Sequence, residues 1–190
     1  TPSRYTSGSG KPAKGVEVLL ETQCLLGDSP YWSARDQRLY WVDILRPSVN
    51  RFDPAAGREE NVALKELVGF VVGRQSGGIV ISTQSGLIGL DFDSGEMAPI
   101  ANPHEQRSQI RFNDGKCDRA GRVWAGTMSM DVAPGMGSLY RLDADRSLKR
   151  MVSDVTIANG VAWSPDNHTL YFADSGKFTI KDAPVGKWRM

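Results

Sequence analysis

Two oxygen-bearing residues occupy the same place in two similar stretches of the sequence. Asp28 lies four residues before Trp32, and Asn159 lies four residues before Trp163. Carboxylate and amide oxygens are ligands that calcium and related hard cations prefer. For either residue alone, an ordinary turn residue before a strand is the simpler interpretation. Their equivalence in two repeats instead indicates that both can bind one cation if the strands that follow them converge on a common axis.

A third polar group lies between these two stretches. The segment RFND contains Arg111, Asn113 and Asp114 and precedes a weaker copy of the same repeat. Together with Asp28 and Asn159, this segment would bring a guanidinium, amides and carboxylates to the top of the common axis. We therefore expect a polar cluster at the mouth of the scaffold, where sites are usually built. The alternative is that Arg111 is an ordinary surface cation.

The elements that must position these residues belong to an internal repeat. Residues 32–43 read WSARDQRLYWVD, and residues 163–174 read WSPDNHTLYFAD, without a gap between the two patterns. Weaker copies cover residues 116–127 and end at residues 78–82. Four apolar positions of these copies lie 40, 44 and 47 residues apart: Leu39, Ile79, Val123 and Leu170. A period of this size, with several strands in each unit, is typical of a β-propeller, whose blades bury their faces against neighbouring blades.

The chain is expected to be all-β, with about three to four propeller blades in residues 16–175. Runs such as VEVLL, RLYWVD and GIVIST alternate with turn sequences rich in Asp, Pro and Gly. No long window has a helical period with caps. Residues 1–15 are interpreted as a flexible leader, and residues 176–190 as a tail that does not align with the repeat.

Composition excludes several classes of function. The formal net charge of +1 predicts neither a nucleic-acid partner nor a membrane partner. No stretch approaches the length of a transmembrane helix. Cys24 and Cys117 are far apart without a CxxC pattern, so they do not form a zinc set, and two cysteines are too few for a disulfide scaffold. Two free thiols in a reducing compartment predict a cytoplasmic protein.

Other reactive side chains fit structural roles better than catalytic ones. Three serines lack the nucleophile-elbow context of a serine hydrolase: Ser29, Ser33 and Ser164. His104 and His168 lie in polar loop sequences and are expected at the surface. Asp43 and Asp174 recur at strand ends and are interpreted as structural carboxylates, and the Trp and Tyr residues of the repeat as blade packing.

Three motifs resemble those of the family that includes gluconolactonase, regucalcin, SMP-30 and the luciferin-regenerating enzyme. LGDSPYW, at residues 26–32, resembles the family pattern GEGPxW or GESPxW. Residues 111–116, followed by GRVWAGTM, resemble RxNDGKxDxxGRxWxGTM. Residues 157–166, IANGVAWSPD, resemble ISNGLAWSPD. The motifs occur in family order across residues 16–175, and the resemblance implies a six-bladed propeller.

The resemblance implies a lactonase, a carboxylic ester hydrolase that acts on a small sugar lactone with one divalent cation, namely Ca, Zn, Mg or Mn. Residue by residue, the metal ligands map onto Asp28 and Asn159, and the substrate-binding residues onto Arg111, Asn113 and Asp114. The family glutamate is Asp28 here, which keeps the charge but is shorter by one methylene. A further aspartate of a later blade, the third ligand and general base, is expected beyond residue 190.

Two alternatives to a working lactonase remain. One is a calcium-binding or interaction propeller without catalysis, and the other is an inactive truncated fragment. Three or four blades do not close a ring of six, so the faces of the first and last blades should expose apolar residues and favour association. We expect four such residues: Val16, Val18, Leu170 and Phe172. Oligomeric state is not predicted.

Overall fold

The computed structural model describes residues 15, 17–103 and 109–185. Within these residues the chain forms strands β1 to β15 and one 3-10 turn, η1. The strands build four antiparallel sheets, three with four strands and one with three. This confirms the prediction of an all-β chain with blades in a β-propeller arrangement. The expected leader, residues 1–15, lies outside the described residues except for Gly15, as does His104.

Each blade is a simple meander in which strands that follow one another pair. Blade 1 contains β1 (Gly27–Ser33), β2 (Arg38–Asp43), β3 (Ser48–Asp53) and β4 (Arg58–Ala63). Blade 2 contains β5 (Val68–Gly73), β6 (Ile79–Thr83), β7 (Gly86–Leu90) and β8 (Met97–Ala101). Blade 3 contains β9 (Ile110–Cys117), β10 (Val123–Ser129), β11 (Gly137–Leu142) and β12 (Leu148–Val155). Blade 4 contains β13 (Ala158–Trp163), β14 (Thr169–Asp174) and β15 (Thr179–Pro184).

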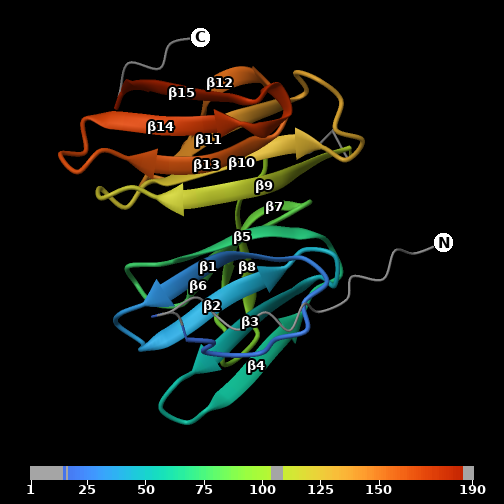
Figure 1. Cartoon of the computed structure of the whole chain (residues 1–190), viewed down its shortest axis with the longest axis vertical. Helices are drawn as coiled ribbons and strands as arrows, with labels where there is room; N and C mark the ends of the chain where they lie inside the picture. Colours follow the sequence, from blue (N-terminus) through green and yellow to red (C-terminus); the bar gives the residue numbers. More distant parts are fainter. Residues whose placement is uncertain (1–14, 16, 104–108, 186–190) are drawn as a thin grey trace.

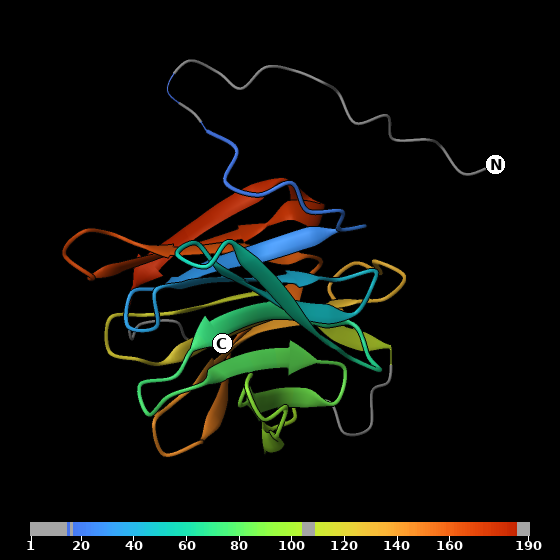
Figure 2. The ribbon, with the colours of Figure 1, turned by 90° about the horizontal axis from the view of Figure 1, so that it is seen from below.

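The first strand of each blade is the innermost one. β1 contacts β5, β5 contacts β9, and β9 contacts β13, so the four first strands form one row. In Figure 1 this row crosses the middle of the molecule, and β1, β9 and β13 point in the same direction. Figure 2 shows from a second side that the strands within a blade are twisted against one another. The starting ends of the innermost strands therefore lie at one end of the molecule.

The core lies between the blades. One apolar cluster joins blades 1 and 2, a second joins blades 2 and 3, and a third joins blades 3 and 4. Blade 2 has a neighbour on each side, and every residue of β6 is buried. A strand that is covered on both faces reads as a continuous apolar run, which explains the sequence IVIST.

Two expectations about exposed residues are wrong. Leu170 and Phe172 are fully buried because their face of blade 4 packs against Trp124 of blade 3. The alternate side chain, Tyr171, faces solvent and is 41% exposed. On the equivalent face of blade 1, Trp32 is 45% exposed, whereas Trp41 is only 6% exposed and donates to Cys24 Sγ at 3.3 Å. Val18 is exposed as expected, and Val16 lies outside the described residues.

The two ends of the described chain differ from their sequence patterns. The β-prone run VEVLL forms no strand in its described part, residues 17–20. The segment expected as a tail begins with the end of η1 (Ser175–Lys177) and continues into β15, which pairs with β14 from Thr179 to Pro184. Thus β15 extends blade 4.

The two cysteines are free and half-buried. Burial, with a smaller contribution from the charge of Asp118, raises the pKa of the Cys117 thiol to about 11. This thiol is protonated at neutral pH and is a poor nucleophile. None of the helical segments in the described part of the chain has the length and apolar character needed to cross a membrane.

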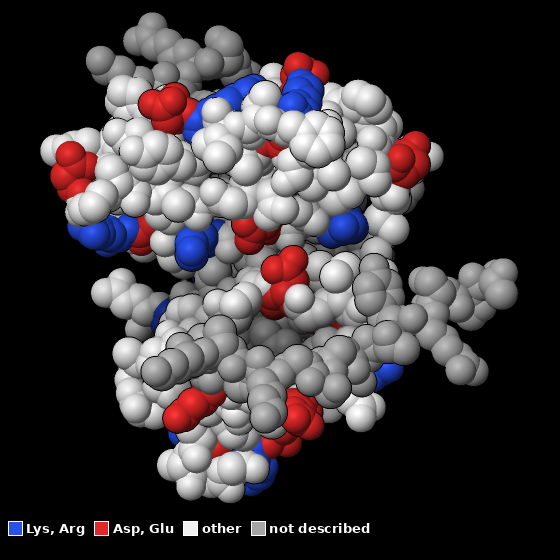
Figure 3. Space-filling view, in the orientation of Figure 1, with Lys and Arg blue, Asp and Glu red and all other residues white. Residues whose placement is uncertain are grey.

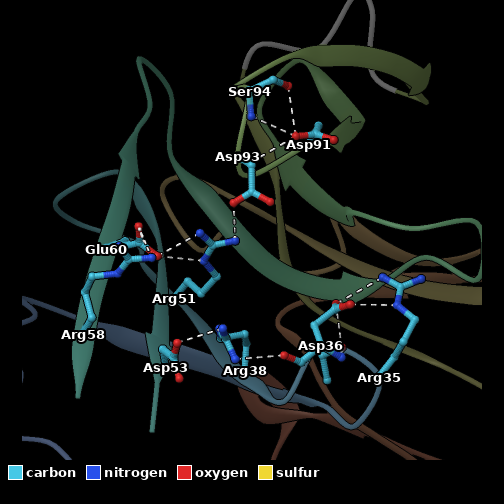
Figure 4. A network of polar contacts seen from close by, with 11 residues as sticks. Arg35, Asp36, Arg38, Arg51, Asp53, Arg58, Glu60, Asp91, Asp93 and Ser94 are labelled. Atoms are coloured by element: carbon cyan, nitrogen blue, oxygen red, sulfur yellow. Dashed lines mark hydrogen bonds and ion pairs between the residues drawn. The ribbon is translucent and has the colours of Figure 1, made fainter. Parts of the chain in front are cut away.

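A polar network ties blade 1 to blade 2 at their outer sides (Figure 4). Arg51 of β3 binds Glu60 of β4 at 2.8 Å and Asp93, in the turn between β7 and β8, at 2.7 Å. Its guanidinium carbon also lies 4.2 Å from the centre of the Phe92 ring. The Arg51 side chain is only 12% exposed, so its contacts are partly shielded from water.

Replacing Arg51 by methionine should lower the free energy of unfolding by about 1–2 kcal/mol, because a mostly buried guanidinium loses two ion pairs, which are partly shielded from water, and a cation–π contact. Arg58→Met is the matched control, since Arg58 binds the same Glu60 but is 63% exposed. Exposed pairs contribute little, so the control should stay within about 0.5 kcal/mol of the wild type. Urea unfolding of both variants measures the difference, and equal losses would contradict a special role for Arg51.

Candidate functional site

All four innermost strands carry the same irregularity near their starting ends. Each has one extra residue relative to its neighbour, so the pairing register shifts by one within the strand. The shifts lie between the following paired residues: Asp28 and Tyr31, Val68 and Val71, Phe112 and Gly115, Asn159 and Ala162. Such β-bulges change the direction of side chains and are common next to functional sites. The candidate site residues lie at or beside three of the four bulges.

Asp28 lies at the exposed start of the bulge in β1. Its Oδ1 accepts a hydrogen bond from the backbone N–H of Ser29 at 2.6 Å. Ser29 has a left-handed backbone with φ of 53°, which is uncommon for a residue other than glycine. Its Oγ accepts a hydrogen bond of 3.0 Å from the backbone N–H of Val71 in β5. Blade 2 thus fixes the backbone beside Asp28.

Asn159 occupies the corresponding position in β13 and is half-buried. Gly160 follows it in the left-handed region with φ of 59°, as Ser29 follows Asp28. The Asn159 Oδ1 accepts the Gly160 N–H at 3.0 Å, and its Nδ2 donates to Ser175 Oγ at 3.3 Å. The equivalence predicted from the repeat therefore extends to the backbone conformation.

Asn113 and Asp114 connect blade 3 to blade 4. The Nδ2 of the buried Asn113 donates to the backbone oxygen of Ala158 at 3.0 Å. Asp114 accepts the N–H of Gly115 on one carboxylate oxygen and that of Gly160 on the other, each at 2.8 Å. Burial raises the pKa of Asp114 above its usual value, and these two hydrogen bonds oppose that shift.

Arg111 lies at the start of β9, close enough to Asp28 for their charges to interact. Its Nη1 donates to the backbone oxygen of Phe112 at 2.9 Å. Burial lowers the pKa of Arg111, and the negative charge of Asp28 acts in the opposite direction. The same Asp28 charge raises the pKa of Asp114. The charge of Asp28 therefore acts on both Arg111 and Asp114. Asp114 also accepts a hydrogen bond from the Gly160 N–H.

The space-filling view shows a hollow between the half of the molecule with blades 1 and 2 and the half with blades 3 and 4 (Figure 3). Acidic and basic side chains both border it, and neither sign dominates this face.

The oxygen ligands at the starting ends of the innermost strands are of the kind that hard cations prefer, but there are few of them. Asp28 provides a carboxylate and Asn159 an amide oxygen, both of the type that such cations prefer. Within residues 15, 17–103 and 109–185, no group of three or more His, Cys, Asp or Glu side chains is placed to hold a metal. Asp28 and Asn159 would therefore form only part of a ligand set, with water or further ligands filling the rest.

Other carboxylates act on the backbone, as the sequence pattern indicated. Asp43 accepts the N–H groups of Leu25 and Leu26 at 2.9 and 3.1 Å. Burial, the largest effect, raises the pKa of Asp43, but its backbone hydrogen bonds outweigh that effect and the pKa is lowered. Asp174 likewise accepts the N–H of Ile157 at 3.0 Å. His168 is an exposed residue beside Asp166.

Sequence reasoning did not identify the residues that hold the two bulges in place. In the sequence, Ser29 lacks the context of a nucleophile and has no other expected role, and Asp114 is expected only as a substrate ligand. A signal was present for one of them, because Ser29 and Gly160 occupy equivalent places in the repeat. The repeat gives no signal for the residues in neighbouring blades to which Ser29 and Gly160 form hydrogen bonds.

Comparison with known proteins identifies related sequences. Residues 26–187 match the family described as SMP-30/Gluconolactonase/LRE-like region. Regucalcin from Danio rerio is 37% identical over 168 residues, which cover 87% of this chain and 57% of that protein. The 6-deoxy-6-sulfogluconolactonase of Pseudomonas putida is 35% identical over 170 residues, which cover 90% of this chain and 58% of that protein. The chain thus spans little more than half the length of these relatives.

A solved structure gives the same picture of the fold. The calcium-binding protein regucalcin from Agrobacterium tumefaciens superimposes with a TM-score of 0.83 at 28% sequence identity. The match covers 88% of this chain and 56% of that one.

Proposed function

This chain belongs to the SMP-30/gluconolactonase/LRE-like family, and on that premise we propose that it provides the metal-binding and substrate-orienting side of a sugar-lactone hydrolase. The observation that carries the proposal is the shared starting end of the innermost strands. There, Asp28 and Asn159 begin equivalent bulges, and Asp114 accepts the N–H of Gly160, the residue after Asn159. The relatives include a lactonase, which supports this class of chemistry.

Each residue has a separate role in the proposal. Asp28 and Asn159 would hold one divalent cation through oxygen, and such a cation polarises a lactone carbonyl when bound. Arg111 would donate hydrogen bonds to the substrate oxygens, where negative charge develops as water attacks. Asn113 has its Nδ2 on Ala158, so its Oδ1 would accept a hydrogen bond from a substrate hydroxyl. The general base, a carboxylate that takes a proton from the attacking water, is expected from a later blade.

Hydrolysis of glucono-δ-lactone and galactono-γ-lactone, assayed in a protein that joins these residues to the later blades, tests the proposal. We expect turnover that is lost on treatment with EDTA and restored by Ca²⁺, Mg²⁺, Mn²⁺ or Zn²⁺, because the oxygen donors need a cation to act on the carbonyl. A pH indicator measures the acid that is released. Turnover that is indifferent to EDTA would contradict the metal-dependent mechanism.

A second candidate is calcium binding without catalysis. The solved relative from Agrobacterium tumefaciens is described as a calcium-binding protein, which favours this reading. Calcium binding by calorimetry, together with no turnover of either lactone in any of the four metals, would support it over the lactonase.

A further inference from the structure

We propose that Asp114 is a positioning residue, which shares the Gly160 N–H with the Asn159 amide oxygen and thereby weakens the hold of that N–H on the oxygen that would bind the cation. The inference rests on the proposed function, because it takes Asn159 as a metal ligand. It changes the role expected for Asp114 from substrate binding to the support of a neighbouring blade.

The first step is the position of the Gly160 N–H. The bulge in β13 shifts the pairing with β14 between Asn159 and Ala162, so Gly160 lies outside the regular ladder. Gly160 is exposed, so its N–H can bond either to water or to a protein acceptor that lies close by. Asp114 supplies one from the adjacent blade, with its Oδ2 at 2.8 Å.

The second step is competition for this single N–H. The Asn159 Oδ1 also lies within 3.0 Å of the Gly160 nitrogen. Asparagine side chains readily form such local hydrogen bonds to their own backbone in turns. A charged acceptor forms the stronger bond, so the Asp114 carboxylate takes the larger share of the donor. Without Asp114, the Asn159 oxygen would be drawn onto its own backbone and away from the axis.

The third step is the conformation of Gly160 itself. Its left-handed φ of 59° is accessible to glycine at little cost, but glycine also populates many other conformations. The other carboxylate oxygen of Asp114, Oδ1, accepts the N–H of Gly115 in the same strand at 2.8 Å. The carboxylate is therefore held by its own strand while it accepts the Gly160 N–H. We call the pair of hydrogen bonds from Gly115 and Gly160 to Asp114 the clamp. The clamp favours one backbone conformation beside Asn159.

Blade 1 offers a partial parallel, in which the Ser29 N–H stays with Asp28 at 2.6 Å and the neighbouring blade is reached through the Ser29 side chain. Ser29, also left-handed, follows the other candidate ligand, Asp28, and its Oγ binds the Val71 N–H of the next blade at 3.0 Å. In both blades, a hydrogen bond to a neighbouring innermost strand fixes the residue after the ligand.

Calorimetric titration with Ca²⁺ and Mn²⁺ tests the inference. Asp114→Asn should bind both ions about 10- to 100-fold more weakly, the range for partners that orient metal ligands. Asp114→Glu keeps the charge but cannot keep both short hydrogen bonds, so we expect a similar loss. Asp53→Asn is the control, because Asp53 is a buried aspartate that accepts backbone N–H groups at the far end of blade 1. It should bind within about twofold of the wild type.

The outcomes separate this inference from the proposed function. If Asn159→Ala binds as the wild type does, the metal assignment fails and the inference fails with it. If Asn159→Ala weakens binding but Asp114→Asn does not, only the inference is overturned. Wild-type affinity in Asp114→Glu would show that the charge alone matters and would also overturn it. If Asp114→Asn does not fold, hydrogen exchange at Gly160 in the unchanged protein decides: protection is expected, and exchange at the rate of an unstructured peptide refutes the clamp.

Discussion

Replacing Asp28 by alanine should weaken the binding of a divalent cation by about 100-fold or more and reduce lactone turnover in parallel. The change removes a negatively charged oxygen ligand, whereas even the residues that only orient ligands account for about 10- to 100-fold. Because Asp28 is exposed and the one hydrogen bond of its side chain within the described part of the chain is the local one to Ser29, the fold should survive the change. Calorimetry with Ca²⁺ and Mn²⁺ measures the affinity, and thermal unfolding without metal confirms the fold.

Two further variants make this prediction specific. Asp36→Ala removes an aspartate beyond the opposite end of β1, where it pairs with Arg35, and should leave the affinity unchanged. Asp28→Glu restores the residue that the related motif usually contains, and should retain binding because the charge is kept and the reach is longer by one methylene. Equal binding by the wild type and Asp28→Ala would remove Asp28 from the metal site.

Replacing Arg111 by alanine should lower kcat/KM for lactone hydrolysis by about 100- to 1000-fold. This is the size of effect observed when a donor to a developing oxyanion is removed, about 3–4 kcal/mol. Cation affinity should stay the same or rise slightly, because Arg111 is a positive charge that interacts with Asp28. Steady-state kinetics and calorimetry on the same preparation therefore distinguish a substrate residue from a metal ligand.

The control for Arg111 is another arginine of blade 3. Arg119 lies in the turn between β9 and β10 and donates to the backbone oxygen of Pro165 at 2.6 Å. It is at the far end of β9, roughly 20 Å along the strand from Arg111, so Arg119→Ala should leave kcat/KM within about twofold. Arg111→Lys should recover only part of the activity, because an ammonium cannot reproduce the planar donor pair of a guanidinium. Unchanged kinetics in Arg111→Ala would make Arg111 an ordinary surface cation.

The repeat alone was enough to predict the fold. The pattern W-S-x5-L-Y recurs in β1–β2 and β13–β14 with the same pairing geometry, since Trp32 lies opposite Leu39 and Trp163 opposite Leu170. Strand alternation and turn residues are local properties, so they are readable without knowledge of what surrounds a strand. The equivalence of Asp28 and Asn159 follows from the same repeat.

The repeat did not show which face of a blade is covered. Leu39 and Leu170 occupy the same position, yet Leu170 is fully buried against blade 3 while Leu39 is partly exposed. The apolar pattern indicates only that one face of a blade can be buried. Whether that face is buried depends on whether another blade packs against it. For the same reason, β15 was not recognised: its residues alternate between exposed and half-buried, and its pairing with β14 gives it its place.

The candidate site residues Asp28, Arg111 and Asn159, and the kind of chemistry each could do, could be predicted from the motifs. The contacts that hold these residues in place became visible only with the packed blades. The clamp from Asp114 to Gly160 joins residues 46 positions apart in different blades. Such a contact depends on the packing of two blades and on a bulge that releases one N–H from its ladder. A sequence motif shows which side chain is present. The hydrogen-bond partner of that side chain depends on how the innermost strands pack side by side.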